Sequence, residues 1–144
     1  ASCLKSASDS IMRSRINPYI IIMGDFNDYP SNKSLVEILD ARKPGNNPEL
    51  YSLYNLMDGK NGGTYKYRGE WGILDQMIVS WTLIDSRNIK TSYSKARILD
   101  FPFLMEEDDR FGGDAPFRTY HGMRYKGGYS DHLPVLLELE ISQP

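Results

Sequence analysis

Three short segments of this sequence carry acidic, amide and imidazole side chains beside strand-like runs. Asp25 and Asn27 follow a continuously apolar run, and Asp75 opens a second run that is rich in strand-forming residues. Asp131 and His132 stand directly before a third run. Sheet proteins place catalytic groups at such strand ends, because the strand fixes the position while the adjoining loop exposes the side chain. The pattern therefore predicts one site assembled from three strand ends.

Asp25 and Asn27 are the first pair with a definite chemistry. Residues two apart on an extended segment point the same way, so the carboxylate and the amide are expected to face one cleft. A phosphodiester hydrolase uses such a pair. The carboxylate takes a proton from water or orients it, and the amide donates hydrogen bonds to the phosphoryl group. Taken alone, Gly-Asp-x-Asn is equally well explained as a structural turn.

Two other kinds of site are excluded by spacing and composition. An EF-hand loop starting at Asp25 requires Gly at its sixth position and an acid at its twelfth, where Pro30 and Val36 stand. A calcineurin-like phosphoesterase needs a Gly-Asn-His segment and further histidines, whereas this chain has only His121 and His132. We interpret His121 as a surface loop residue.

Asp131, His132 and Asp75 form the second candidate group. Adjacent residues diverge on a regular strand, so Asp131 and His132 must lie in the turn before Leu133 if both reach one site. Asp75 is suited to hold an imidazole in one tautomer and to favour its charged form. Two structural interpretations remain open, because Ser-Asp-His before a strand is also a common cap or turn and Asp75 also suits a buried, hydrogen-bonded acid.

In this order the segments resemble the endonuclease/exonuclease/phosphatase family of metal-dependent phosphoesterases. The matching segments are Gly24-Asp25-Phe26-Asn27, Leu74-Asp75-Gln76-Met77 and Ser130-Asp131-His132-Leu133-Pro134, with Gln76 in place of the family's usual aromatic residue. The resemblance implies that Asp25 activates the attacking water and that Asn27 contacts the phosphate. It also implies that His132 contacts the scissile phosphate while Asp75 orients its ring.

The resemblance also implies a divalent metal, Mg²⁺ or Mn²⁺, which suits an oxygen-rich site. Asp131 and Asp25 are the ligands that the motif implies, and Asp28 is a weaker contributor. The family's N-terminal half carries an Asn, a metal-binding Glu and a further His that have no counterpart here. The isolated chain is therefore expected to bind metal poorly and to turn over little.

The expected fold is α/β, namely the C-terminal half of a four-layer α-β-β-α sandwich with one mixed, mostly antiparallel sheet and helices on one face. We expect residues 1–144 to be the C-terminal part of the family's domain, with the N-terminal half outside this chain. The inner apolar face of the sheet would then lack its partner, at a cost of about 25 cal/mol per Å² of exposed apolar area. A homodimer or the N-terminal half is expected to cover it.

Hydrophobic periodicity predicts an alternation of helices and strands. Helices are expected at residues 2–14 and 34–41, and strands at 19–23, 64–80 (a pair), 94–99 and 133–141. The strand at residues 19–23 is continuously apolar, as expected of a central strand that is buried on both faces. Residues 100–128 are expected to form an ordered surface loop near the site, because loops of that length are usually functional or disordered.

Charge and composition restrict the partners. The chain has 17 Lys+Arg and 19 Asp+Glu, and a net charge of −2 lacks the basic excess of a nucleic-acid binder. A small, lipid or sugar phosphate is therefore preferred over nucleic acid as the phosphoester substrate. The lone Cys3 excludes an intrachain disulfide and a cysteine-based zinc site, and no run approaches the roughly 20 apolar residues of a membrane span.

Other conspicuous side chains allow two interpretations. A cluster on the predicted hairpin forms an aromatic and cationic rim that stacks on a substrate, or else contributes to the core: Tyr65, Tyr67, Arg68 and Trp71. Arg118, Arg124 and Lys126 precede Asp131, and we interpret them as solvated charge. At the level of function, the alternative to a hydrolase is a non-catalytic binding or scaffold module that keeps the fold.

Overall fold

A four-stranded sheet is the centre of the computed structural model, which describes residues 1–42, 49–54 and 62–142. Its order is β1-β6-β3-β2, where β1 is Ile21–Asp25, β6 is Asp75–Ser80, β3 is Leu50–Ser52 and β2 is Ala41–Arg42. Strands β1 and β3 run antiparallel to β6, and β2 runs parallel to β3. The sheet is therefore mixed and mostly antiparallel, as the sequence predicted.

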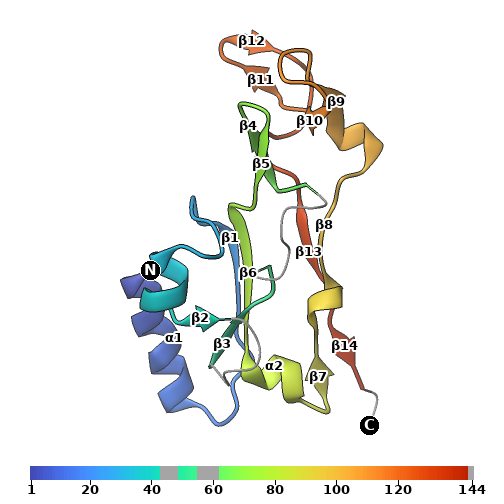
Figure 1. Cartoon of the computed structure of the whole chain (residues 1–144). Coiled ribbons are helices and arrows are strands. Elements are labelled where there is room, and N and C mark those ends of the chain that lie inside the picture. Colours follow the sequence, from blue (N-terminus) through green and yellow to red (C-terminus); the bar gives the residue numbers. More distant parts are fainter. Residues whose placement is uncertain (43–48, 55–61, 143–144) are drawn as a thin grey trace.

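Helical segments cover one face of this sheet (Figure 1). Helix α1 spans Ser2–Ser14, the predicted range, and the segment η1 spans Ser34–Ile38. The buried side chains between these segments and the sheet are Leu35, Leu39, Ala41, Leu50 and Ile78. The second predicted helix is wrong in extent, because η1 is a single π-helical turn. Asp40 adopts a left-handed conformation with φ of 60°, which ends the helical segment before β2 begins.

Short strands cover the opposite face. Strand β8 (Ala96–Ile98) pairs with β13 (Val135–Leu137), and β7 (Ile89–Lys90) pairs with β14 (Glu140–Ile141). A second core fills the space between these ladders and the sheet, and its buried members are Tyr51, Leu53, Tyr54, Ile73, Met77, Val79, Leu83 and Ala96. The expectation that the inner face of the sheet would lack a partner is therefore wrong for β6 and β3. Helix α2 (Trp81–Asp85) and the 3-10 turn η2 (Tyr93–Lys95) complete this layer.

Strand β1 differs from its prediction because it lies at the edge of the described sheet. Ile21 and Met23 project on the same side as Val79 and Met77 of β6, to which they are paired. The β6 residues are fully buried, whereas Ile21 and Met23 are 41% and 55% exposed. The prediction of a strand buried on both faces therefore fails, since the short ladders cover β6 without extending over β1.

Residues 100–128 are not one surface loop but a projection of small hairpins, which we call the arm. It contains the 3-10 turn η3 (Pro102–Leu104), the pair β9 (Met105–Glu107) with β10 (Asp114–Pro116), and the pair β11 (Tyr120–His121) with β12 (Arg124–Tyr125). Figure 1 shows the arm at one end of the molecule, next to a separate hairpin. That hairpin consists of β4 (Tyr65–Tyr67) and β5 (Glu70–Gly72). The sequence predicts a strand pair within residues 64–80, but β4 pairs with β5, whereas β6 pairs with β1 and β3 of the main sheet.

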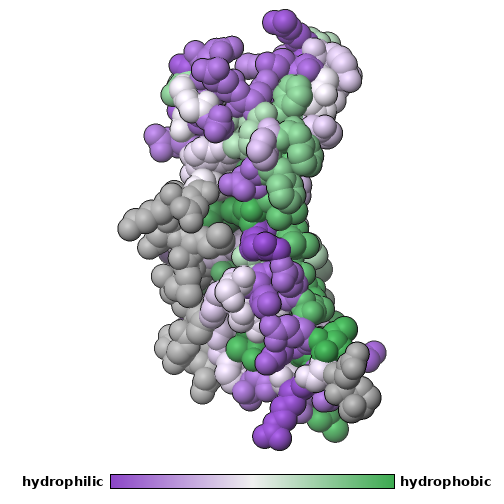
Figure 2. All heavy atoms as spheres, turned by 90° about the vertical axis from the view of Figure 1, so that its right-hand side faces the viewer, coloured by the Kyte–Doolittle hydropathy of each residue, from purple (hydrophilic) through white to green (hydrophobic). Residues whose placement is uncertain are grey.

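The surface along β8 and β13 is partly apolar. Figure 2 shows hydrophobic side chains gathered on this side, between more hydrophilic ends. Exposed aromatic residues where the arm begins and ends belong to it: Phe101, Phe103 and Tyr129. The described helices include none that is long and apolar enough to span a membrane. The described chain is a mixed α/β structure with few helices, in which most strands are short and belong to small sheets.

Candidate active site

Two carboxylates face each other at one end of the main sheet. Asp25 is the last residue of β1 and Asp75 is the first residue of β6, and the antiparallel register pairs them directly. Like charges opposite each other on a ladder are destabilising. This end of the sheet is therefore electrostatically suited to a cation, and it brings together two of the residues that the sequence predicted.

His132 contacts the second of these carboxylates. Its Nδ1 lies 2.7 Å from Oδ2 of Asp75, and both side chains are partly buried. Because a carboxylate only accepts hydrogen bonds, Nδ1 carries the proton and Nε2 is left for another partner. The backbone of His132 forms an isolated antiparallel bridge with Tyr65 of β4. The predicted pairing of Asp75 with the imidazole is present in the structure.

Thr64 joins the segments that carry Asp75 and His132. Its side chain is fully buried, and Oγ1 accepts hydrogen bonds from the backbone N–H of Leu74 (3.1 Å) and of Asp75 (3.2 Å). Its carbonyl oxygen accepts a hydrogen bond from the N–H of Leu133 at 2.7 Å. The sequence analysis missed this residue, because one threonine at the start of a strand gives no signal of its tertiary contacts.

Asn27 lies beside Asp25, as the spacing predicted. Its backbone N–H donates to Oδ1 of Asp25 at 2.8 Å, and its side-chain Nδ2 lies 3.5 Å from Oδ2 of the same carboxylate. Asn27 has a φ of 50°, a left-handed conformation that asparagine tolerates better than most residues. The turn therefore fixes the Asp25 carboxylate and presents both side chains, which are exposed, on the same side.

Asp28 has a structural role in this chain. Its two carboxylate oxygens accept hydrogen bonds from Ser34 Oγ and Asn32 Nδ2, each at 2.6 Å. The bond from Ser34 and then that from Asn32 hold the pKa of Asp28 below its usual value. Gln76 supports the same loop from beneath, because its Nε2 donates to the carbonyl oxygens of Asp28 (2.8 Å) and Ile73 (3.0 Å). The residue that departs from the family pattern thus fills a buried supporting position.

Asp131 lies apart from the other predicted metal ligand. Among the described residues, one group of ligand atoms lies within 4.8 Å of one another, and it consists of Asp25, Asp75 and His132. Asp131 is exposed and does not belong to this group. The backbone N–H of His132 donates to Ser130 Oγ at 3.1 Å, so the turn directs the imidazole to the site. Within this group, the carboxylate oxygens are the donors that suit Mg²⁺ or Mn²⁺, whereas Nδ1 of His132 is hydrogen-bonded to Asp75.

Tyr54 lies near the Asp75 carboxylate in the core between the layers. Burial, and then the negative charge of Asp75, raise the pKa of Tyr54 to about 12. Its phenol therefore remains protonated over the physiological range and donates to the carbonyl oxygen of Arg97 at 3.2 Å.

Comparison with known proteins assigns the family. A family model described as the endonuclease/exonuclease/phosphatase family matches residues 1–141, nearly the whole chain. The chain belongs to this family. No curated protein and no solved structure matches it. Membership in the endonuclease/exonuclease/phosphatase family indicates hydrolysis of a phosphoester or nucleic-acid substrate.

In this endonuclease/exonuclease/phosphatase chain, the predicted rim only partly surrounds the site. The Tyr65 ring lies 4.8 Å from the His132 ring, and Tyr67 stacks on Tyr65 at 6.4 Å between centroids. The Arg68 guanidinium lies 5.2 Å from the centroid of the Tyr67 ring. Trp71 is paired instead with Lys66 across the hairpin. The rings of the two tyrosines thus form the aromatic edge of the site.

The basic residues predicted before Asp131 lie on the arm. Lys126 forms an ion pair with Glu106 at 2.8 Å, whereas Arg124 is exposed on β12. His121, interpreted as a surface residue, is exposed at the end of β11. Arg118 lines a cavity between the arm and the β4–β5 hairpin. Arg118, His121, Arg124 and Lys126 all lie outside the group formed by Asp25, Asp75 and His132.

Proposed function

We propose that this chain provides the catalytic groups of a divalent-metal-dependent phosphoester hydrolase, a phosphodiesterase or phosphatase. The observation that supports this most directly is the convergence of Asp25, Asp75 and His132, whose ligand atoms lie within 4.8 Å of one another. Family membership supports the same reaction class. The slight negative charge of the chain favours a small, lipid or sugar phosphate over a long nucleic acid.

Each residue of the site has a separate role in the proposed reaction. The Asp25 carboxylate takes the proton from the attacking water, in a position fixed by the Asn27 backbone N–H. The Asn27 amide donates to a phosphoryl oxygen. His132 presents Nε2 to the scissile phosphate, because Nδ1 is bonded to Asp75. Asp75 thus orients the ring.

A divalent cation fits the donor chemistry at this end of the sheet. Asp25 and Asp75 are opposed across the ladder, so a cation between them would relieve their repulsion. Asp25 would hold Mg²⁺ or Mn²⁺, with Asp131 as the second ligand that the sequence motif predicts. When bound, the cation supplies charge neutralisation at the phosphate and favours ionisation of a bound water.

Hydrolysis assays on the protein that contains this chain test the proposal. We expect hydrolysis of bis-p-nitrophenyl phosphate or p-nitrophenyl phosphate that requires Mg²⁺ or Mn²⁺ and stops with a chelator. Asp25→Ala should lower kcat about 10²- to 10⁴-fold, the usual contribution of a general base. Asp85→Asn is the matched control, because Asp85 is exposed on α2 at the opposite end of β6.

Two results would contradict the proposal. One is hydrolysis that survives both chelation and Asp25→Ala, which would contradict the metal dependence and the role of Asp25. The other is a folded protein that binds Mn²⁺ at Asp25 without turnover of any phosphoester, which would favour the non-catalytic binding or scaffold module. The exposure of Asp131 outside the ligand group is the observation that favours this second function.

A further inference from the structure

The His132 ring contacts a carboxylate at one nitrogen and an aromatic ring at its face. Its Nδ1 lies 2.7 Å from Oδ2 of Asp75, which fixes one atom of the ring. The Tyr65 ring lies 4.8 Å away between centroids, with 32° between the two ring planes. Aromatic rings at this separation attract each other in offset arrangements. Asp75 and Tyr65 therefore restrain the imidazole in different directions.

The hydrogen bond to Asp75 is not a complete restraint on this ring. The χ2 torsion of histidine has broad, roughly two-fold minima, so the torsion itself leaves the ring plane free to rotate. Nε2 lies off the Cβ–Cγ axis about which this rotation occurs, so its position changes when the ring turns. A second ring packed against the face of the imidazole opposes that rotation, and Tyr65 occupies this place at His132.

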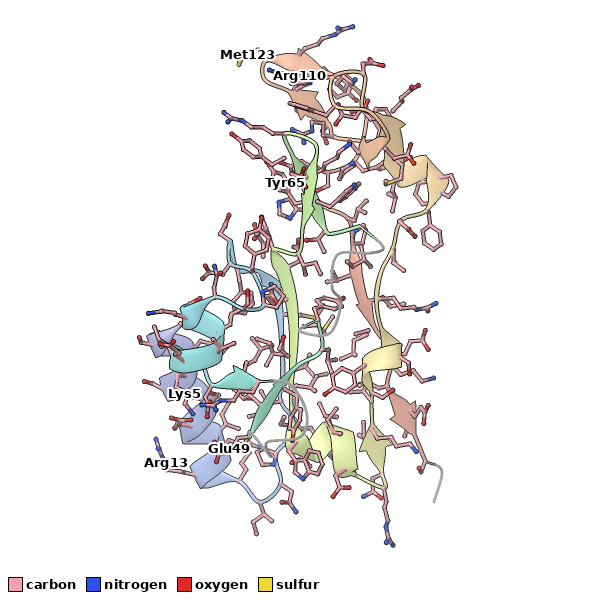
Figure 3. All side chains as sticks on the ribbon, viewed as in Figure 1. Lys5, Arg13, Glu49, Tyr65, Arg110 and Met123 are labelled. Atoms are coloured by element: carbon pink, nitrogen blue, oxygen red, sulfur yellow. The ribbon has the colours of Figure 1, made fainter. Side chains whose placement is uncertain are left out.

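Tyr65 is suited to this task because its own strand is held on both sides. Its backbone pairs with Gly72 across the β4–β5 hairpin and forms the isolated bridge with His132. Lys66 points to the opposite face of β4, where its Nζ donates to the Gly112 carbonyl oxygen of the arm at 2.7 Å. Figure 3 shows Tyr65 on this hairpin, between the arm and the main sheet.

The surroundings of the Tyr65 ring leave little of it for a substrate. Tyr67 stacks on it with 6.4 Å between centroids and 13° between planes. The Arg68 guanidinium lies 5.2 Å from the centroid of the Tyr67 ring. The ring that contacts His132 is therefore itself supported by a neighbouring ring, which agrees better with a fixed wall than with an open stacking surface.

We propose that Tyr65 is a positioning residue, whose ring holds the His132 imidazole in the orientation that presents Nε2 to the substrate. This inference rests on the role proposed for His132 in hydrolysis. Tyr65 touches neither the phosphate nor the attacking water in this role, so it acts through His132 alone. Loss of the ring should therefore lower kcat and kcat/KM equally, as expected for an interaction that matters in the transition state.

Nitrogen-15 NMR of the metal-free chain tests the restraint without substrate or turnover. At about pH 8, where a histidine side chain is ordinarily neutral, the ring nitrogens report which tautomer is present. We expect a single Nδ1–H tautomer for His132, because Asp75 accepts from Nδ1. His121, the other histidine of the chain, is exposed on β11 and is the internal reference for a ring that exchanges both tautomers.

Substitutions of Tyr65 separate the ring from the rest of the side chain. Tyr65→Thr keeps a strand-forming residue without a ring. We expect the tautomer ratio of His132 to move toward that of His121, and kcat of the protein that contains this chain to fall about 10- to 100-fold at nearly constant KM. Tyr65→Phe, which keeps the ring, should retain both the tautomer and kcat.

Two further variants keep the test decisive. Tyr65→Val replaces the ring by an apolar, strand-forming side chain, so it should give the same changes as Tyr65→Thr even where the threonine disturbs the fold. Tyr125→Thr is the matched control, because Tyr125 is a 66% exposed tyrosine on strand β12 of the arm. It should match the parent protein in both measurements.

Three results would overturn the inference. The first is a single His132 tautomer that survives in both Tyr65→Thr and Tyr65→Val, since Asp75 would then suffice. The second is a rise in KM at constant kcat, which indicates a ring that stacks on the substrate. The third is an equal loss in Tyr65→Phe and Tyr65→Thr, which would assign the effect to the hydroxyl group.

These outcomes are distinguishable from a failure of the proposed hydrolase. A single His132 tautomer that depends on the Tyr65 ring, in a protein without turnover, supports the restraint and overturns the hydrolase alone. Turnover that depends on Mg²⁺ and Asp25, in a protein whose His132 tautomer does not depend on Tyr65, overturns the positioning role alone.

Discussion

Asp75 lies between a second carboxylate and an imidazole, and these two neighbours determine the roles of the other catalytic residues. Across the ladder it faces Asp25, and through Oδ2 it contacts His132 at 2.7 Å. The imidazole Nδ1–H donates a hydrogen bond to this carboxylate, whereas a second carboxylate has no donor to offer. Asp75 is therefore assigned to the ring, and Asp25 remains for water or a metal ion.

Thr64 is a positioning residue, and a single substitution tests this role. Thr64→Val keeps the shape of the side chain but removes the oxygen that accepts from the N–H groups of Leu74 and Asp75. We expect a loss of about 1–3 kcal/mol in the free energy of unfolding, since two buried donors lose their acceptor. In urea unfolding and steady-state kinetics, kcat should fall while KM changes little.

Thr64→Ser is the matched control for this prediction. It retains Oγ1 and loses only a methyl group, so it should restore kcat to near the parent value with a smaller loss of stability. Equal kcat in Thr64→Val and Thr64→Ser would show that the hydroxyl has no part in placing Asp75.

At the level of elements, local pattern predicted what depends on local interactions. Helix α1 begins and ends where its helical spacing predicted, at Ser2 and Ser14. Strands β4 and β6 also follow from alternation and strand-forming residues, whereas β5, which pairs with β4, was not predicted. The edge position of β1 could not be predicted in this way. A continuously apolar run indicates burial, but whether a layer covers it depends on contacts far away in the sequence.

The candidate site was likewise predicted where it depends on local sequence and not where it depends on tertiary contacts. The three motifs identified Asp25, Asn27, Asp75 and His132, and the structure brings all four to one end of the sheet. Asp131 is adjacent to His132 in sequence, yet its side chain lies outside the ligand group. Adjacent side chains diverge unless the turn is sharply bent, and no sequence pattern specified that bend.

The contact between the arm and the β4–β5 hairpin should depend on pH. Lys66 Nζ lies 3.0 Å from Oδ2 of Asp108 and donates to the Gly112 carbonyl oxygen at 2.7 Å, and its side chain is only 4% exposed. The hydrogen bond from Lys66, followed by that from the Phe111 N–H, holds the pKa of Asp108 below its usual value of 3.8.

The direction of this effect follows from linkage. Because the pKa of Asp108 is lower in the folded state, its stabilising contribution is complete above about pH 4 and is lost as the pH falls through the folded-state pKa. Urea unfolding from pH 2 to pH 7 should show a steeper acid loss for the parent than for Asp108→Asn. Asp109→Asn, at the neighbouring carboxylate, should retain the steep dependence, and identical curves for all three proteins would contradict the assignment.

At the scale of the whole molecule, the two layers meet over β6 and β3 but leave β1 uncovered. Ile21 and Met23 continue the apolar face of the inner core into solvent, on a strand whose outer edge is unpaired within the described sheet. An edge strand of this kind is a template for pairing with another chain. Covering its apolar side chains would contribute about 25 cal/mol per Å² buried.

The 144-residue chain is therefore expected to self-associate through β1. Light scattering coupled to size exclusion should give a mass above that of one chain at micromolar concentration. Met23→Lys should shift the chain to a monomer, because a charge would have to be buried in the pairing surface. Phe103→Lys is the matched control, since Phe103 is 60% exposed and belongs to η3, at the start of the arm and away from β1.

The same measurement distinguishes the two partners expected for this surface. A homodimer through β1 predicts that Met23→Lys, and not Phe103→Lys, yields a monomer in any longer form of the protein as well. Coverage by the family's N-terminal half predicts association only for the 144-residue chain, because the longer form already covers Ile21 and Met23. A stable, well-folded monomer of the unmodified 144-residue chain would contradict both, since its exposed β1 face would then need no partner.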